Sequence, residues 1–216
     1  SNLIGSTFLG GADSDGLNQM FANYGENYRG EIFLDNADNI IIASCTSSAD
    51  FPVTAGAFQS TLGGGQDGVL VSMPPNCSSL LWSSFLGGSD DDNALGVRLA
   101  LDGALVVTGS TESADFPTTP GSYQPTAIGD RDGYVVRMTS GALAMVAGTY
   151  FGTTAQDGSY FLDTDLADDV WIYGQTDGNI PIIPAGTYGQ ANGPIFIAKL
   201  NSDLSAVTIS TTIGPL

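Results

Sequence analysis

A motif that recurs at a fixed interval is the sequence feature that most constrains the fold of this chain. Asp50–Pro52 reads Asp-Phe-Pro, and the same three residues return 65 positions later at Asp115–Pro117. Each copy is followed at equal spacing by an aromatic-glutamine pair, Phe58-Gln59 or Tyr123-Gln124, and then by Asp-Gly. A weaker third copy begins at Ile180-Pro181. A period of this size predicts successive units of similar structure.

A second motif marks where the units end. Thr7–Gly11 recurs as Ser84–Gly88, more loosely as Thr149–Thr153, and in truncated form at Thr211–Gly214, at intervals of 77, 65 and 62 residues. We therefore expect residues 1–11 to be the last strand of a preceding unit. Three units are then expected at 12–88, 89–153 and 154–216.

Each unit contains four segments that are typical of strands. Asp102-Gly103 separates the first two segments of the second unit and predicts a two-residue hairpin, because primed turns need positive φ. Ser140-Gly141 marks the last turn of the same unit. The expected strands are 30–34, 40–45, 69–73 and 80–86 in the first unit, 94–101, 104–109, 134–138 and 143–151 in the second, and 160–163, 170–174, 195–200 and 206–213 in the third.

The apolar runs predict sheets that are covered on both faces. Ile40–Ile42 and Leu105–Val107 are short, β-branched and bounded by Asp, Asn or Gly, which excludes long helices. Four-stranded sheets stacked around an axis, the blades of a β-propeller, meet this description. A parallel β-helix has shorter coils, and an immunoglobulin-like array needs about seven strands per unit. We predict an all-β fold with three blades of four antiparallel strands and one extra strand.

Three blades cannot close a ring, since propellers typically have about four to eight. An open arc leaves sheet faces and edges bare, which soluble proteins avoid. We therefore expect the chain to be part of a larger propeller. Either the missing blades of its own parent chain or other protein chains would cover the ends.

The motifs resemble the β-propeller repeat (SBBP-type repeat) of bacterial secreted and cell-surface proteins. Its units open on Ser-Thr-Tyr-Leu-Gly-Gly, carry an Asp-x-x-Gly-Asn hairpin and an Asp-Phe-Pro loop, and end in Lys-Leu. The matching stretches are Ser6–Gly11, Asp35–Ile40, Asp50–Pro52, Gly56–Gln59, Ser83–Gly88, Asp115–Pro117, Gly121–Gln124 and Ala198–Asn201. The resemblance implies export, often by type IX secretion, and display outside the cell, without an established set of catalytic residues.

Charge excludes several classes of partner. The chain has 23 acidic and 5 basic residues, for a formal net charge of -18. Nucleic-acid phosphates and anionic membrane surfaces need clustered Lys and Arg, so neither is an expected partner. No apolar run approaches the roughly 20 residues that span a bilayer. The chain starts within repeat material, so we expect a segment of a longer, processed protein, for which a missing signal peptide is uninformative.

The residue inventory argues against an enzyme. Without histidine the chain lacks the usual general base and most zinc ligands. A pair of carboxylates could still hydrolyse glycosides, but Glu26, Glu31 and Glu112 are the only glutamates and none is repeated. Cys45 and Cys77 should lie at opposite edges of one sheet, which favours thiols over a disulfide.

Acidic loops follow the glycine motif in all three units. They contain Asp13 and Asp15, then Asp90 and Asp92, then Asp157. Such oxygen-rich loops could hold calcium, the one cofactor that the sequence suggests. The alternative is that Asp and Asn begin turns by accepting hydrogen bonds from their own backbone, and none of the loops has EF-hand spacing.

The repeated aromatic residues have two interpretations. Phe51 and Phe116, with Phe58 and Tyr123, could stack on sugars. Their recurrence at one place in each unit favours a structural role instead, in which each ring plugs the long loop onto the core of its blade.

The sequence thus predicts a non-catalytic scaffold or interaction propeller, located outside the cell or on its surface. Adhesion, a surface filament or docking to another envelope protein would be its role. The first unit is longest because of an insertion at Asn18–Tyr28, so Tyr24 and Tyr28 are the predicted contact residues. The alternative is a propeller that binds or cleaves carbohydrate, with polysaccharide as its partner.

Overall fold

The described part of the chain is built from strands alone. The computed structural model describes residues 3–20, 28–190 and 192–214, which form twelve strands and no helix, hence none that could cross a membrane. The predicted all-β fold is confirmed, with three four-stranded antiparallel sheets. The first sheet comprises β1 (Glu31–Leu34), β2 (Ile40–Thr46), β3 (Asp67–Met73) and β4 (Trp82–Leu86); the second β5 (Gly96–Leu99), β6 (Leu105–Thr111), β7 (Asp132–Met138) and β8 (Met145–Phe151); the third β9 (Asp157–Thr164), β10 (Val170–Thr176), β11 (Ile195–Leu200) and β12 (Val207–Ile213).

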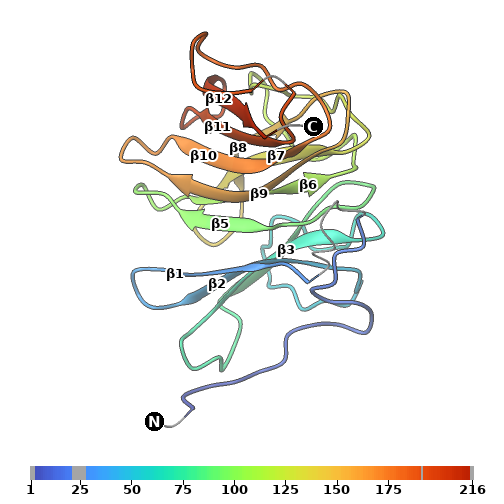
Figure 1. The fold of residues 1–216 in the computed structure, drawn as a ribbon. Helices are drawn as coiled ribbons and strands as arrows, with labels where there is room; N and C mark the ends of the chain where they lie inside the picture. Colours follow the sequence, from blue (N-terminus) through green and yellow to red (C-terminus); the bar gives the residue numbers. More distant parts are fainter. Residues whose placement is uncertain (1–2, 21–27, 191, 215–216) are drawn as a thin grey trace.

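The sheets stack in sequence order and converge at their first strands (Figure 1). β1 contacts β5, and β5 contacts β9. Arg29, just before β1, contacts the third sheet. Its Nη2 donates to the carbonyl oxygen of Tyr160 on β9 at 3.0 Å. Arg98 on β5 lies between Glu31, 2.6 Å away, and Asp163. Convergence of the inner strands gives the stack the fan shape of consecutive propeller-like blades.

Both faces of the second sheet are buried, as its continuous apolar runs predicted. Val107 pairs with Val136, and Val106 pairs with Arg137. Successive side chains of a strand point to opposite faces, so Val107 packs toward the first sheet and Val106 toward the third. Every residue of β6 and β7 is buried. The third sheet differs, because burial alternates along β10 and β11. One of its faces packs on the second sheet and the other is partly exposed.

The Phe-Pro loops fold back onto their own sheets. Phe51 and Phe116 are buried, and Ile180 takes the same place in the third unit. The Phe116 ring lies 4.2 Å from that of Tyr134 and 6.1 Å from that of Tyr150. The predicted plug is therefore confirmed for Phe51 and Phe116. Each such buried ring contributes roughly 1.5–3 kcal/mol of apolar burial. Phe58 of the same prediction is partly buried, and Tyr123 is 38% exposed.

The turn at Asp102-Gly103 corrects the sequence prediction. Ala100 and Ala104 form the closing backbone hydrogen bond, so the loop holds three residues rather than two. Only Gly103 has positive φ, at 85°. A type I turn followed by one left-handed residue satisfies the same glycine signal as a primed two-residue turn, which is why the sequence could not separate them.

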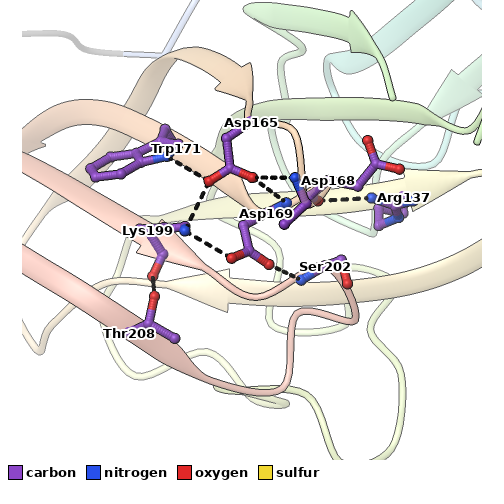
Figure 2. A network of polar contacts seen from close by, with 9 residues as sticks. Arg137, Asp165, Asp168, Asp169, Trp171, Lys199, Ser202 and Thr208 are labelled. Carbon is purple, nitrogen blue, oxygen red and sulfur yellow. Dashed lines mark hydrogen bonds and ion pairs between the residues drawn. The ribbon is translucent and has the colours of Figure 1, made fainter. Parts of the chain in front are cut away.

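Lys199, the single lysine, fastens the first hairpin of the third sheet (Figure 2). Its Nζ lies 2.8 Å from a carboxylate oxygen of Asp165 and 2.8 Å from one of Asp169. Asp165 also accepts the amides of Ala167 and Asp169, and together these contacts, Lys199 first, lower the pKa of Asp165 to about 2. The hairpin is thereby held against β11.

Arg137 on β7 joins the second sheet to the third. Its side chain is 6% exposed, and Nη2 lies 2.8 Å from the Asp102 carboxylate. Nη1 donates to the carbonyl oxygen of Asp168 at 3.2 Å, a contact drawn in Figure 2. Asp168 in turn accepts the amide of Leu101 at 2.7 Å. Two hairpins from neighbouring sheets therefore share one buried guanidinium.

We predict that Arg137→Met lowers the free energy of unfolding by about 1–3 kcal/mol, because it leaves the part-buried carbonyl of Asp168 without this donor and Asp102 without its ion pair. Chemical denaturation followed by tryptophan fluorescence measures the change. Asp163→Asn is the control, since its carboxylate is 79% exposed and 4.0 Å from Arg98, and it should change stability by less than about 0.5 kcal/mol. Equal stabilities of the two variants would contradict the role of Arg137.

Candidate functional site

The aspartates that the sequence proposed as calcium ligands separate into two groups. Asp92 and Asp157 are completely buried, and Asp15 is half-buried. Asp13 and Asp90 are exposed. The acidic loops are therefore not uniform solvent-facing clusters. Asp92 and Asp157 turn into the two junctions between successive sheets, and Asp15 turns inward ahead of the first sheet.

Local hydrogen bonds place the inward aspartates. Oδ2 of Asp92 accepts the amide of Gly88 at 2.7 Å and the hydroxyl of Ser113 at 2.8 Å. Asp15 and Asp157 accept the equivalent amides of Gly11 and Thr153. This is the turn that Asp favours where a strand ends, since its side chain accepts hydrogen bonds from nearby backbone. The turn interpretation of these residues thus has direct support.

A second aspartate faces the inward one at each junction between described sheets. A methyl group built on Gly87 would meet carboxyl atoms of both Asp67 and Asp92 at 2.7 Å. Asp132 and Asp157 flank Gly152 in the same manner. The motif glycine therefore leaves room for two carboxyl groups, and we call these two sets the junction aspartate pairs.

Asp67 and Asp132 begin the third strand of their sheets, and their carboxyl groups organise the preceding loop. Asp67 accepts the amides of Gly63 and Gly64 and the side-chain amide of Gln59. Asp132 accepts the amides of Ile128 and Gly129. The Gln59 side chain of the repeat thus links the aspartate to the motif glycine, because its Oε1 also accepts the amide of Gly87. Each pair ties the long loop, the third strand and the next sheet together.

Burial raises the pKa of all four carboxyl groups. For Asp92 it reaches about 7, mainly through desolvation, although hydrogen bonds from the Gly88 amide and the Ser113 hydroxyl oppose the rise and the Asp67 charge adds to it. Desolvation likewise raises the pKa of Asp67, Asp132 and Asp157. Two facing carboxyl groups out of water disfavour double ionisation.

Sequence reasoning singled out only half of each junction pair. Asp92 and Asp157 were proposed as ligands, whereas Asp67 and Asp132 were noted only as the Asp-Gly that closes the repeat. The signal was present in their equal spacing from the Asp-Phe-Pro motif. What the sequence lacked was the packing that places the start of one third strand beside the first turn of the next unit.

The remaining predicted residues do not gather at the junctions. Tyr28 is 85% exposed, and Tyr24, like Glu26, lies outside the described residues. The start of the insertion is anchored, because buried Asn18 accepts the side-chain amide of Gln66 at 3.0 Å. Glu31 is bound by Arg98, as noted above. Glu112 is exposed.

Both cysteines carry free thiols, as the strand geometry favoured. Cys45 is buried on β2, opposite Gly68 on β3, and burial raises its pKa to about 12. Cys77 lies in the turn between β3 and β4 with a φ of 53°. A thiol with a pKa that high is almost wholly protonated at neutral pH and is a poor nucleophile.

Stability should fall as the pH rises from 5 to 8. The folded protein holds protons on the junction aspartates more tightly than the unfolded chain, whose Asp pKa is about 3.9. Their stabilising contribution is therefore complete below that value and is lost as the pH rises through the folded-state values, for Asp92 near 7. We expect the free energy of unfolding to decrease by a few kcal/mol, because each unit of pKa difference between the folded and unfolded states corresponds to about 1.4 kcal/mol. Denaturant titrations at each pH measure it.

Asp92→Asn tests the source of that dependence. Oδ2 can remain the acceptor for Gly88, while the new amide group lies beside Thr111 and carries no charge. We expect the variant to be more stable than the parent at pH 8 and to show a flatter pH profile. Asp90→Asn, at an exposed position, should leave the slope unchanged. A parent profile that rises from pH 5 to 8 would contradict the assignment.

Calcium is the second test of these loops. Among the described residues no group of three or more His, Cys, Asp or Glu is close enough to hold a metal ion. Because the inward carboxylates already accept backbone amides, we expect the melting temperature to agree within about 1 °C in 5 mM calcium and in EDTA. A ligand that binds only the native state must raise it, so a rise of several degrees would restore the calcium interpretation.

Comparison with known proteins assigns the chain to no family. No protein-family model matches it, and no curated protein is significantly similar to it in sequence.

Proposed function

We propose that the chain is a non-catalytic scaffold, a propeller segment of a secreted bacterial surface protein that acts by binding other protein surfaces. Adhesion, a surface filament and docking to an envelope protein all use such a scaffold. The order and spacing of the repeat motifs, which resemble those of secreted propeller repeats, support export. Three consecutive propeller-like sheets support the scaffold.

The observation that carries the proposal is the outer face of the first sheet. Ile32 is 65% exposed, whereas Val97, at the same position of the second sheet, is completely buried against its neighbour. Ile42 is half-buried and its counterpart Val107 is completely buried. At these two positions the side chain is buried completely only where a neighbouring sheet is present. The rest of the outer face is covered by the Phe51 loop, beneath which Val71 and Phe85 are buried. Burying such apolar area yields about 25 cal/mol per Å², which favours a partner on this face.

The outer face of the third sheet is also apolar but differs in composition. Phe161 is 50% and Tyr173 36% exposed, and their rings lie 5.7 Å apart. The guanidinium of Arg29 sits 3.7 Å from the Phe161 ring centroid. The position of Tyr173 corresponds to Thr108, which is completely buried in the second sheet. Aromatic residues of this kind are enriched at protein interfaces.

A second candidate function is carbohydrate binding, favoured by a groove between the first and second sheets. The groove has a volume of about 390 Å³ and is lined by Trp82, Asp35, Asp102 and the turn at Thr139–Gly141. An indole beside carboxylates and hydroxyls is suited to a sugar ring. Quenching or enhancement of tryptophan fluorescence by oligosaccharides, lost in Trp82→Ala and retained in Trp171→Ala, would favour this candidate.

Site-specific photo-cross-linking in the source cells tests the scaffold proposal. With a photoreactive amino acid at Ile32, we expect covalent adducts to other proteins. We also expect a protease added outside the cells to cleave the segment. The same amino acid at Leu166, which is 93% exposed at a hairpin tip, should give few adducts. A segment that stays inside the cell, or equal yields of cross-linked adducts at Ile32 and Leu166, would contradict the proposal.

A further inference from the structure

Residues 11–13 make the same three hydrogen bonds that connect the first sheet to the second. The amide of Gly11 donates to Asp15, that of Ala12 to Asp50 and that of Asp13 to the hydroxyl of Ser48. At the next junction the equivalent amides of Gly88, Ser89 and Asp90 donate to Asp92, Asp115 and Ser113. The chain therefore enters the first sheet as if it came from the outermost strand of a sheet before it.

The residues ahead of this junction lie where that outermost strand belongs. Gly5, five positions before Gly10, packs against the backbone of Asn76 in the turn between β3 and β4. Trp82, five positions before Gly87, contacts Gly141 in the corresponding turn of the second sheet. The segment lies on the side of the first sheet away from the second (Figure 1).

The two faces of the segment differ in burial. Leu9, the counterpart of buried Leu86 and Phe151, packs against the core of the first sheet. Phe8, the counterpart of Phe85 and Tyr150, is fully exposed at 103%, although both counterparts are buried. The extra strand that the sequence predicts at residues 1–11 is not formed in residues 5–10, which lack a paired strand. One face of the segment is thus in its final environment, and the other lacks the sheet and its Phe-Pro loop that bury the counterparts, where Phe51 packs on Phe85 and Phe116 on Tyr150.

We propose that residues 5–10 are a donated strand: they complete a four-stranded propeller sheet whose other three strands come from outside residues 3–214. The occupant of the first sheet's outer face is that three-stranded antiparallel sheet, with the free edge of its third strand paired to residues 5–10. Backbone hydrogen bonds between the edges and burial of alternate side chains supply the binding energy.

The junction defines what the partner sheet must carry. At Gly87 and Gly152 an aspartate from the preceding third strand faces the inward aspartate, whereas at Gly10 the nearest atoms all belong to Asp15. The partner's third strand should therefore begin with Asp-Gly, as β3 and β7 do. Its inner face must be apolar, since it would cover Ile40, Ile42 and a cavity of about 220 Å³ beside Leu9, Phe51 and Val69.

A chimera can supply such a sheet without any partner protein or cell, so its result is independent of the proposed surface role. Residues 89–142, which contain β5–β7, are copied ahead of Ser1, which places Gly10 where Gly152 follows β7 in the parent. We expect the Phe8 amide to become protected, as the amide of Tyr150 donates to Gln124. Its hydrogen exchange should slow by about 100-fold or more, and the melting temperature should rise by several degrees.

Two substitutions separate donation from simple packing. Phe8→Asp should leave the melting temperature of the parent chain unchanged and lower that of the chimera, whereas Leu9→Asp should lower both. A second chimera with residues 154–204, which contain β9–β11, guards against misfolding of the first. Rapid exchange of the Phe8 amide in both chimeras would overturn the proposal. So would a parent dimer that Phe8→Asp dissociates, because a second copy would then occupy the face.

Discussion

Packing of one four-stranded sheet on the next is the interaction on which the rest of the structure depends. Each sheet presents apolar side chains on two faces, because alternate residues of a strand point in opposite directions. Only the second sheet has a neighbouring sheet on each face, and β6 and β7 are buried throughout. β3 of the first sheet is also buried throughout, because Phe51 and Leu9 cover its outer side. The first and third sheets each keep one partly exposed face. Covering these faces would therefore both stabilise the sheets and bind a partner, because each depends on burial of the same apolar side chains.

The junction aspartate pairs show how a repeated motif serves this packing. A glycine without a side chain lets two carboxyl groups meet between sheets, and the hydrogen bonds of each carboxyl fix a loop. The arrangement costs desolvation, which appears as the raised pKa of Asp92 and its neighbours. It also explains why acidic residues recur in register: they connect units, and calcium is not needed for that role. The donated strand extends the same logic to the junction before the first sheet.

Much of this fold could be predicted from the sequence, because its elements repeat. The predicted segment 69–73 lies within β3, and 195–200 coincides with β11. The buried plugs at Phe51 and Phe116 followed from recurrence. The turn at Gly103 did not, since one glycine satisfies two turn types. Of the candidate site, the sequence indicated Asp92 and Asp157 but not their partners Asp67 and Asp132, which are 25 residues away in each case and meet only through the stacking of sheets.

The sequence by itself determined the repeat, the all-β class and the order of strands within each sheet. Spacing and hydrophobic pattern are local properties, and strands that follow one another in the chain are neighbours in each sheet. Only the tertiary structure decided which equivalent residues differ in environment. Ile32 and Val97 have the same place in their units, yet one is exposed and the other buried. Phe8 and Phe85 differ in the same way. The physical reason is that burial depends on the neighbouring sheet, which no residue encodes in its own strand.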